Sequence, residues 1–214
     1  MKLILDFDDV VFDTKSFKTK RLFKSLIPVG LSAQYFKKHY ARERIGRGAY
    51  IFSEHLQKIQ RETGIPVSIP KILRKITKGA ETFLNPHIVR LMKEVGKKHT
   101  VLVTQGEPLL QQAKIRGSSV HKLVSSVTIV GKGESKETAL RAFCSKHKNE
   151  ICYFIDDSFE HFILARTPKN LVQIFLPKSG DSAPKEVIDA GAVIQISRRL
   201  LPRLSKERLE TIIK

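Results

Sequence analysis

Four aspartates stand close together near the start of the chain, and their spacing is suited to chemistry on a charged group. Asp6 and Asp8 are separated by one apolar residue, and Asp9 and Asp13 follow shortly after. Carboxylates this close repel one another, by roughly 4 kcal/mol for a pair about 4 Å apart at an effective dielectric constant near 20. A hard divalent cation with oxygen ligands would relieve that repulsion. The stretch therefore predicts a cation site beside a carboxylate that is already ionised at neutral pH and can act as a nucleophile.

The residues before these acids predict the element that holds them. Leu3, Ile4 and Leu5 form a continuous apolar run, which is typical of a parallel strand that is covered on both faces. Asp6 follows directly, where the strand would leave the sheet. Open α/β sheets bind their ligands in the crevice outside the carboxyl ends of the strands. We therefore expect a functional site at this edge.

The second half of the chain alternates between apolar runs and helical patterns. We expect strands at residues 100–103, 127–130, 151–155, 172–176 and 193–196, and helices at 86–95, 108–117, 135–146, 159–166, 184–190 and the end of the chain. This alternation predicts an α/β fold with a doubly wound parallel sheet. Thr104 follows one strand and Asp156-Asp157 another, so these residues should meet Asp6 and Asp8 at one edge.

These strand-end residues, taken in order, resemble the motifs of the haloacid dehalogenase-like hydrolases, most of which are magnesium-dependent phosphatases. The apolar strand with Asp6-Phe-Asp8-Asp9 is similar to the first motif, and Val-Leu-Val-Thr104 to the second. Lys136, about twenty residues before Asp156-Asp157, has the place of the third, and that acidic pair has the place of the fourth. Lys132 is an alternative for the site lysine. The resemblance covers nearly the whole chain and implies a Rossmann-like core.

The resemblance also implies a role for each residue. Asp6 would attack phosphorus to form an aspartyl-phosphate, and Asp8 would act as general acid and then general base. Mg²⁺ would be held by Asp6, the backbone carbonyl of Asp8, Asp157 and Asp156. Thr104, Gln105, Gly106 and Lys136 would bind the phosphoryl group. A phosphomutase would use the same residues, whereas Asp8 and the acidic pair argue against a dehalogenase.

Residues 15–81 interrupt the strand–helix alternation with helical patterns alone, and we expect a helical cap domain there, with the core formed by residues 1–14 and 82–214. The family carries such a cap, which closes over the site and selects the substrate. Arg42, Arg44 and Arg47, next to Gly46 and Gly48, are candidates for gripping an anionic substrate, because arginine binds phosphate bidentately. The expected substrate is a small phosphomonoester or a nucleotide.

Positive charge is concentrated in the same segment. The net charge is +18, and residues 15–78 contain 16 Lys or Arg against three acids, which is +13 of that total. A solvated basic surface is the simplest explanation. The alternative is a nucleic-acid-binding or end-processing protein that uses the basic cap, with the site idle or acting on terminal phosphates; its binding would weaken with salt. Aromatic residues make up only 7% of the chain and show no stacking motif.

Composition limits the other classes of function. No apolar run is long enough for a transmembrane helix, and acids interrupt the region that a signal peptide would need. Cys144 and Cys152 lack metal-ligand spacing and are expected to be buried free thiols. We therefore expect a cytoplasmic protein that does not associate with membranes. The seven histidines show no paired ligand spacing, and no role is assigned to them.

Overall fold

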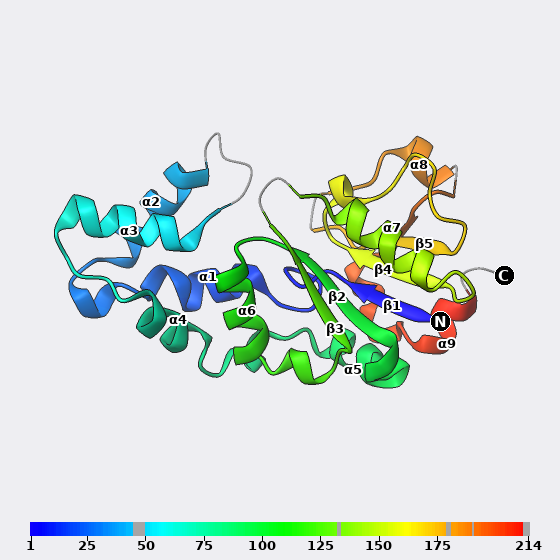
Figure 1. Cartoon of the computed structure of the whole chain (residues 1–214), viewed down its shortest axis with the longest axis horizontal. Helices are drawn as coiled ribbons and strands as arrows, with labels where there is room; N and C mark the ends of the chain where they lie inside the picture. The colour runs from blue at the N-terminus through cyan, green and yellow to red at the C-terminus, as the bar shows by residue number, and fades with distance from the viewer. Residues whose placement is uncertain (45–49, 132–133, 179–180, 190, 212–214) are drawn as a thin grey trace.

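A six-stranded parallel sheet forms the centre of the molecule (Figure 1). The computed structural model describes residues 1–44, 50–131, 134–178, 181–189 and 191–211, with the side chains of 42–44 excepted. The strand order is β3-β2-β1-β4-β5-β6, and every neighbouring pair is parallel. The strands are β1 (Lys2–Leu5), β2 (Thr100–Gln105), β3 (Ser126–Val130), β4 (Cys152–Asp156), β5 (Leu171–Phe175) and β6 (Ile194–Gln195). The predicted doubly wound fold is confirmed.

Helices cover both faces of the sheet, which explains the continuous apolar run in β1. Leu3 and Leu5 belong to one buried cluster, together with α5 (Pro86–Val95), α6 (Pro108–Gly117) and α9 (Lys206–Thr211). Ile4 points to the other cluster, with α7 (Lys136–Lys146) and α8 (Lys185–Asp189). Figure 1 shows α7 and α8 on the opposite side of the sheet from α5 and α9. The free thiols Cys144 and Cys152 are buried in the second cluster, as expected.

Two helix starts lie where the sequence predicts them, because each has a capping side chain. Asn85 accepts a hydrogen bond from the backbone N–H of His87, and Pro86 follows as the first residue of α5. Ser135 accepts one from Glu137 N–H in the same way and fixes the start of α7. Lys136 is therefore the first residue of that helix, at the edge of the sheet where β4 ends.

The predicted helix at 159–166 is wrong. The structure has only a 3₁₀ turn at Phe159–His161, followed by irregular backbone. The reason is Gln173 on β5, whose side-chain amide bonds both backbone groups of Ile163, at 2.7 and 2.9 Å. These groups are then unavailable for a helix. The predicted final helix is present as the short α9, and a 3₁₀ helix at Arg198–Arg203 that contains Pro202 precedes it.

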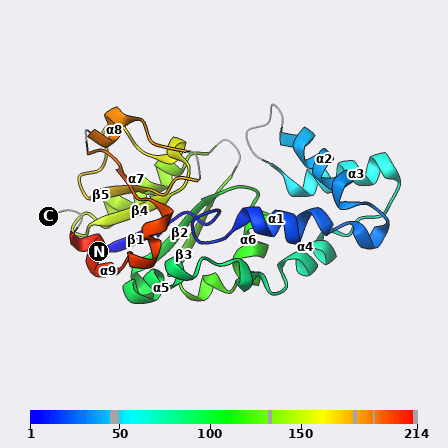
Figure 2. The same ribbon diagram turned by 180° about the vertical axis from the view of Figure 1, so that it is seen from behind.

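The inserted segment consists of helices and turns, without a strand among its described residues. These helices are α1 (Thr14–Lys20), α2 (Ala33–Arg44), α3 (Phe52–Thr63) and α4 (Ile69–Thr77), with short 3₁₀ helices at Leu22–Lys24, Ile27–Val29 and Ala80–Phe83. They extend from the sheet away from both termini (Figures 1 and 2). In the described part of the chain, no helix is long and apolar enough to span a membrane.

The insertion packs tightly on the core where α4 meets α6. A Cβ atom added at Gly117 would lie 2.5 Å from the carbonyl oxygen of Thr77, so only a glycine fits. Gly117 ends α6 and Thr77 ends α4. The two helices therefore meet backbone to backbone, and both views show them side by side (Figures 1 and 2).

Candidate active site

Asp6 meets an acidic pair from far along the chain, Asp156 and Asp157, at the carboxyl ends of β1 and β4. These strands are neighbours, and Leu5 pairs with Ile155. Asp6 follows Leu5, and Asp156 and Asp157 follow Ile155. All three are buried, and one carboxylate oxygen from each lies within 4.8 Å of the others. The predicted convergence of the first and fourth motifs is therefore what the structure shows.

Lys136 joins two of these carboxylates. Its Nζ atom lies 2.8 Å from Asp6 Oδ1 and 2.7 Å from Asp156 Oδ2, and the side chain is almost completely buried. Burial acts to lower the pKa of Lys136, but Asp6 and Asp156 outweigh it and raise that pKa. The ammonium group thus stays charged beside the predicted nucleophile. The alternative, Lys132, lies outside the described residues.

Asp6 and Asp156 have opposite electrostatic environments. Burial, together with the charge of Asp156, raises the pKa of Asp6 to about 7, although Lys136 acts to lower it. Burial also acts to raise the pKa of Asp156, but His161 and Lys136 outweigh it and lower that pKa. His161 Nδ1 lies 3.0 Å from Asp156 Oδ2, and its Nε2 lies 3.1 Å from Gln105 Oε1. His161, to which the sequence analysis assigns no role, therefore contacts two residues of this site.

Asp157 has a different lysine partner, Lys178, which follows β5 at the same edge of the sheet. The Nζ atom of Lys178 lies 2.6 Å from Asp157 Oδ2 and 3.1 Å from Asp9 Oδ2. Burial raises the pKa of Asp157 despite this ion pair. Asp9 has a φ of 60°, a left-handed conformation that L residues seldom adopt, and the side chain of Arg198 donates to its carbonyl at 2.7 Å.

Asp8 is held by three donors, two of them from α6. Gln111 Nε2 lies 2.7 Å from Asp8 Oδ2, while Lys114 Nζ and Thr14 Oγ1 both lie 2.5 Å from Asp8 Oδ1. Burial acts to raise the pKa of Asp8, but Lys114 and the hydrogen bonds outweigh it and lower that pKa. Lys114 is itself only 3% exposed. The contacts therefore favour the ionised form of Asp8 and fix its orientation.

The loop after β2 approaches the same site. Gln105 and Gly106 line the cavity described below, whereas Thr104 is fully buried beneath it, with Oγ1 3.4 Å from Gln111 Nε2. Gly106 has a φ of 148°, and a Cβ atom there would lie 2.9 Å from Gln111 Nε2. A glycine is thus required for the amide that holds Asp8 to reach its position.

A cavity of about 320 Å³ opens above these acids, and the insertion forms one of its walls. Among the residues that the structure describes, five of those that line the cavity come from the insertion: Phe17, Lys18, Leu22, Tyr40 and Tyr50. The positions of the predicted anion-binding side chains, those of Arg44 and Arg47, relative to this cavity are not described. Arg47 lies outside the described residues, and Arg44 is in α2 with a side chain that is not described.

Glu107 connects the insertion to the loop after β2. Its carboxylate accepts hydrogen bonds from the backbone N–H groups of Phe52, at 2.8 Å, and Ser53, at 3.1 Å, at the start of α3. Glu107 is buried, and a carboxylate at a helix N-terminus is favoured both by the unpaired N–H groups and by the helix dipole. This contact fixes the position of α3 relative to the residues that line the site.

Sequence reasoning missed five residues at this site: Gln111, Lys114, Glu107, His161 and Lys178. Only Gln111 and Lys114 carried a usable signal. They are three residues apart, so they share one face of α6, and that face is otherwise turned toward apolar core. A polar pair on a core-facing helix surface requires partners, and Asp8 provides them.

No family model and no curated protein matches the sequence. Solved structures, in contrast, match over nearly the whole chain. A haloacid dehalogenase-like hydrolase from Burkholderia xenovorans LB400 superposes with a TM-score of 0.69 at 17% identity, covering 95% of this chain and 97% of that one. A HAD phosphatase from Thermococcus onnurineus superposes with a TM-score of 0.60 at 12% identity, covering 100% and 98%. The chain has the haloacid dehalogenase-like fold.

The same fold occurs in proteins with different chemistry. A HAD-hydrolase from Bacillus subtilis, described as bound to magnesium, superposes with a TM-score of 0.57 at 16% identity and covers 100% of this chain and 98% of that one. Proteins described as dehalogenases also share the haloacid dehalogenase-like fold. At identities this low the match establishes the fold, and the chemistry has to be argued from the site itself.

The donors at the site of this haloacid dehalogenase-like core fit a hard divalent cation. Asp6, Asp156 and Asp157 offer oxygen atoms, which Mg²⁺ prefers. Among the described residues, the ion-paired cluster contains five carboxylates (Asp6, Asp8, Asp9, Asp156 and Asp157) and three lysines (Lys114, Lys136 and Lys178). The formal charge that remains is two negative units, which one divalent cation would neutralise.

Proposed function

We propose that the protein is a Mg²⁺-dependent phosphohydrolase that acts through an aspartyl-phosphate on Asp6, with a small phosphomonoester or nucleotide as substrate. The observation that carries this proposal is that Asp6, Asp157 and Lys136 line one cavity, with Asp156 buried directly beside them. A single buried acid beside a strand would be explained by helix capping. Three acids around a shared point, with a buried lysine among them, are the arrangement that transfer of a phosphoryl group requires.

In the first step, a carboxylate oxygen of Asp6 attacks phosphorus. The new oxygen–phosphorus bond forms while the bond to the substrate alcohol breaks. Asp8, whose contacts favour the carboxylate, takes up a proton from solvent and passes it to the leaving oxygen. Lys136 lies 2.8 Å from Asp6 and can stabilise negative charge on the phosphoryl oxygens as it moves into place. When bound, the cation would be held by Asp6, Asp156, Asp157 and the carbonyl of Asp8, and would neutralise charge on the transferring group.

In the second step, water hydrolyses the aspartyl-phosphate. Asp8 takes a proton from the water, whose oxygen attacks phosphorus, and the bond to Asp6 breaks to release phosphate and restore the carboxylate. Lys114, Gln111 and Thr14 support this role, because they stabilise Asp8 as the carboxylate that accepts the proton. The insertion would act as the cap that limits the access of water to the cavity.

A phosphatase screen tests the proposal most directly. We expect the full-length protein to release phosphate from at least one small phosphomonoester or nucleotide, to need Mg²⁺, and to lose this turnover by about 10⁴-fold on Asp6→Asn. Asp189→Asn, which removes an exposed acid on α8, is the matched control and should be fully active. Turnover that persists in Asp6→Asn would eliminate Asp6 as the nucleophile.

A second candidate function is nucleic-acid binding by the basic insertion. The observation that favours it is a groove of about 660 Å³ between α1 and α2, whose lining includes Phe23 and three lysines, Lys24, Lys37 and Lys38. Lysines around an aromatic residue can hold the phosphates and a base of a single strand. Because binding would release counterions, its affinity should fall steeply between 50 and 200 mM salt, roughly 10-fold or more.

Fluorescence anisotropy with labelled single-stranded oligonucleotides tests this candidate. Lys37→Gln combined with Lys38→Gln should weaken binding, whereas Lys97→Gln combined with Lys98→Gln, an equal charge change far from the groove, should not. Equal weakening by both pairs would show that the net charge of +18 acts without a defined site.

A further inference from the structure

Lys178 differs in its access to solvent from Lys136, the lysine that lies between Asp6 and Asp156. Its side chain is 50% exposed, whereas that of Lys136 is 1% exposed. Lys136 is enclosed between Asp6 and Asp156, so its ammonium group is a fixed part of the cluster. Lys178 carries its charge on a flexible stem at the mouth of the site and can exchange its contacts with water. Of these two ammonium groups, Lys178 is the one that can be displaced.

The ammonium group of Lys178 and a divalent cation would use the same carboxylate. Lys178 Nζ lies 2.6 Å from Asp157 Oδ2, and Asp157 also belongs to the trio whose oxygen atoms lie within 4.8 Å of one another. A cation held by that trio would stand a few ångströms from the ammonium group and would repel it strongly at this distance. The two positive groups therefore compete for Asp157.

We propose that Lys178 is an internal competitor of the divalent cation: it neutralises Asp157 in the cation-free protein and leaves this carboxylate when the cation binds. The inference rests on the proposed function for the presence of the cation. Asp9 provides the position to which Lys178 withdraws, because its Oδ2 is already 3.1 Å from Nζ. Asp9 is fixed in place, since its Oδ1 accepts from Thr14 N–H and its carbonyl accepts from Arg198.

If Lys178 competes with the cation, its removal should lower the stability of the cation-free protein but raise the affinity for the cation. Removal of a lysine with a purely structural role would not produce both effects. Without Lys178, the cation-free protein loses the partner of a buried carboxylate and becomes less stable. The same change removes a positive charge that opposes the cation, so the cation binds more tightly. A lysine that only supported the loop would, on removal, weaken the fold and the cation site together.

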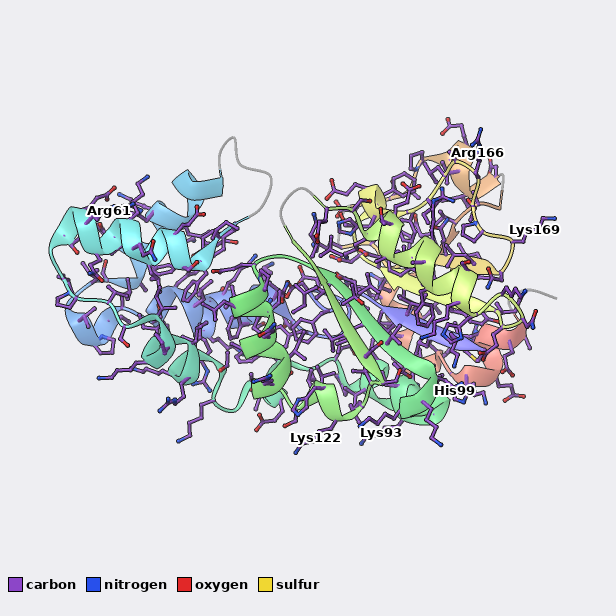
Figure 3. The ribbon with its side chains drawn as sticks, in the orientation of Figure 1. Arg61, Lys93, His99, Lys122, Arg166 and Lys169 are labelled. Atoms are coloured by element: carbon purple, nitrogen blue, oxygen red, sulfur yellow. The ribbon has the colours of Figure 1, made fainter. Side chains whose placement is uncertain are left out.

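Titration calorimetry of the full chain with Mg²⁺ and Mn²⁺, without substrate, tests this inference. We expect Lys178→Met to bind the cation about 10-fold more tightly than Lys169→Met, because one unit charge a few ångströms away is removed. In EDTA, Lys178→Met should melt about 2–4 °C lower than this control, and Mg²⁺ should close the gap. Lys169 is a suitable control because it carries the same charge at the outer edge of the core (Figure 3). The binding heat that is lost in Asp157→Asn is the heat of cation binding at this site.

The outcomes separate this inference from the proposed function. If the wild type binds the cation through Asp157, and Lys178→Met binds it no more tightly than Lys169→Met, Lys178 is not a competitor while the proposed function stands. If neither the wild type nor Lys178→Met shows binding that depends on Asp157, both are overturned. Binding by Lys178→Met that exceeds that of the wild type supports the inference.

Discussion

Two lysines of the core site, Lys114 and Lys136, are chemically identical to the lysines of the insertion, but their surroundings are opposite. Lys114 and Lys136 are 3% and 2% exposed, and each is paired with at least one buried or half-buried carboxylate. Basic residues of the insertion such as Lys24, Lys37 and Lys38 are exposed and line an open groove. Figure 3 shows Arg61, on α3, at the outer surface of the molecule. The comparison teaches that a buried lysine acts on particular atoms, whereas exposed lysines act mainly through their summed charge.

Lys136→Met should have the largest effect on stability, because it leaves Asp6 and Asp156 buried without their shared partner. Breaking a buried ion pair by removing one member costs about 3–5 kcal/mol. Urea unfolding measured in EDTA should show this loss, and Mg²⁺ should restore part of it by taking over the neutralising role. A loss below about 1 kcal/mol would mean that the ammonium group and carboxylates are solvated rather than enclosed.

Lys114→Met should have a smaller, pH-dependent effect. A carboxylate whose pKa is lowered on folding contributes stability above its unfolded pKa, near 3.9, and this contribution is lost as the pH falls through the folded pKa. Asp8 has such a lowered pKa, mainly because Lys114 outweighs burial. The loss on Lys114→Met should therefore be about 2 kcal/mol at pH 7 and should shrink below about pH 4. Unfolding curves from pH 3 to pH 7 measure it, and a constant difference would contradict the assignment.

Glu107→Gln should have a moderate and local effect, because the amide still accepts a hydrogen bond but lacks the charge that favours a helix N-terminus. The expected loss is about 1 kcal/mol. Hydrogen exchange should become faster at Phe52 and Ser53, whose N–H groups bond Glu107. Glu160→Gln, an exposed acid at the same cavity, serves as the control. Unchanged protection at both amides would show that α3 is positioned by packing alone.

Lys37→Gln with Lys38→Gln should have the smallest effect on stability, within about 0.5 kcal/mol, because exposed charges contribute little to folding. Thermal melting of this variant beside Lys136→Met compares the loss of two exposed lysines with the loss of one buried lysine. A large destabilisation by the pair would show that the groove lysines have specific partners. Their expected contribution is instead to oligonucleotide affinity, as proposed above.

The sequence predicted those parts of the site that depend on where strands end. Asp6, Asp156 and Asp157 were predictable because each follows a continuous apolar run, and parallel strands bring such positions to one edge. Lys114 and Gln111 carried a signal only through the face of α6 that they share, and the sequence does not identify Asp8 as their partner. Lys178 follows a strand without a motif. The incorrect helix at 159–166 shows the limit of periodicity, because one side chain, Gln173, takes the backbone groups a helix would need.

The contact between Gly117 and Thr77 determines which part of the insertion can move. A hinge at both ends of residues 15–81 would have to pull α4 away from α6, although these two backbones are closer than any side chain would allow. We therefore expect α4 to keep its position relative to the sheet when other parts of the insertion move. A movement of α3 away from the cavity would have to break the hydrogen bonds that Glu107 accepts from Phe52 and Ser53.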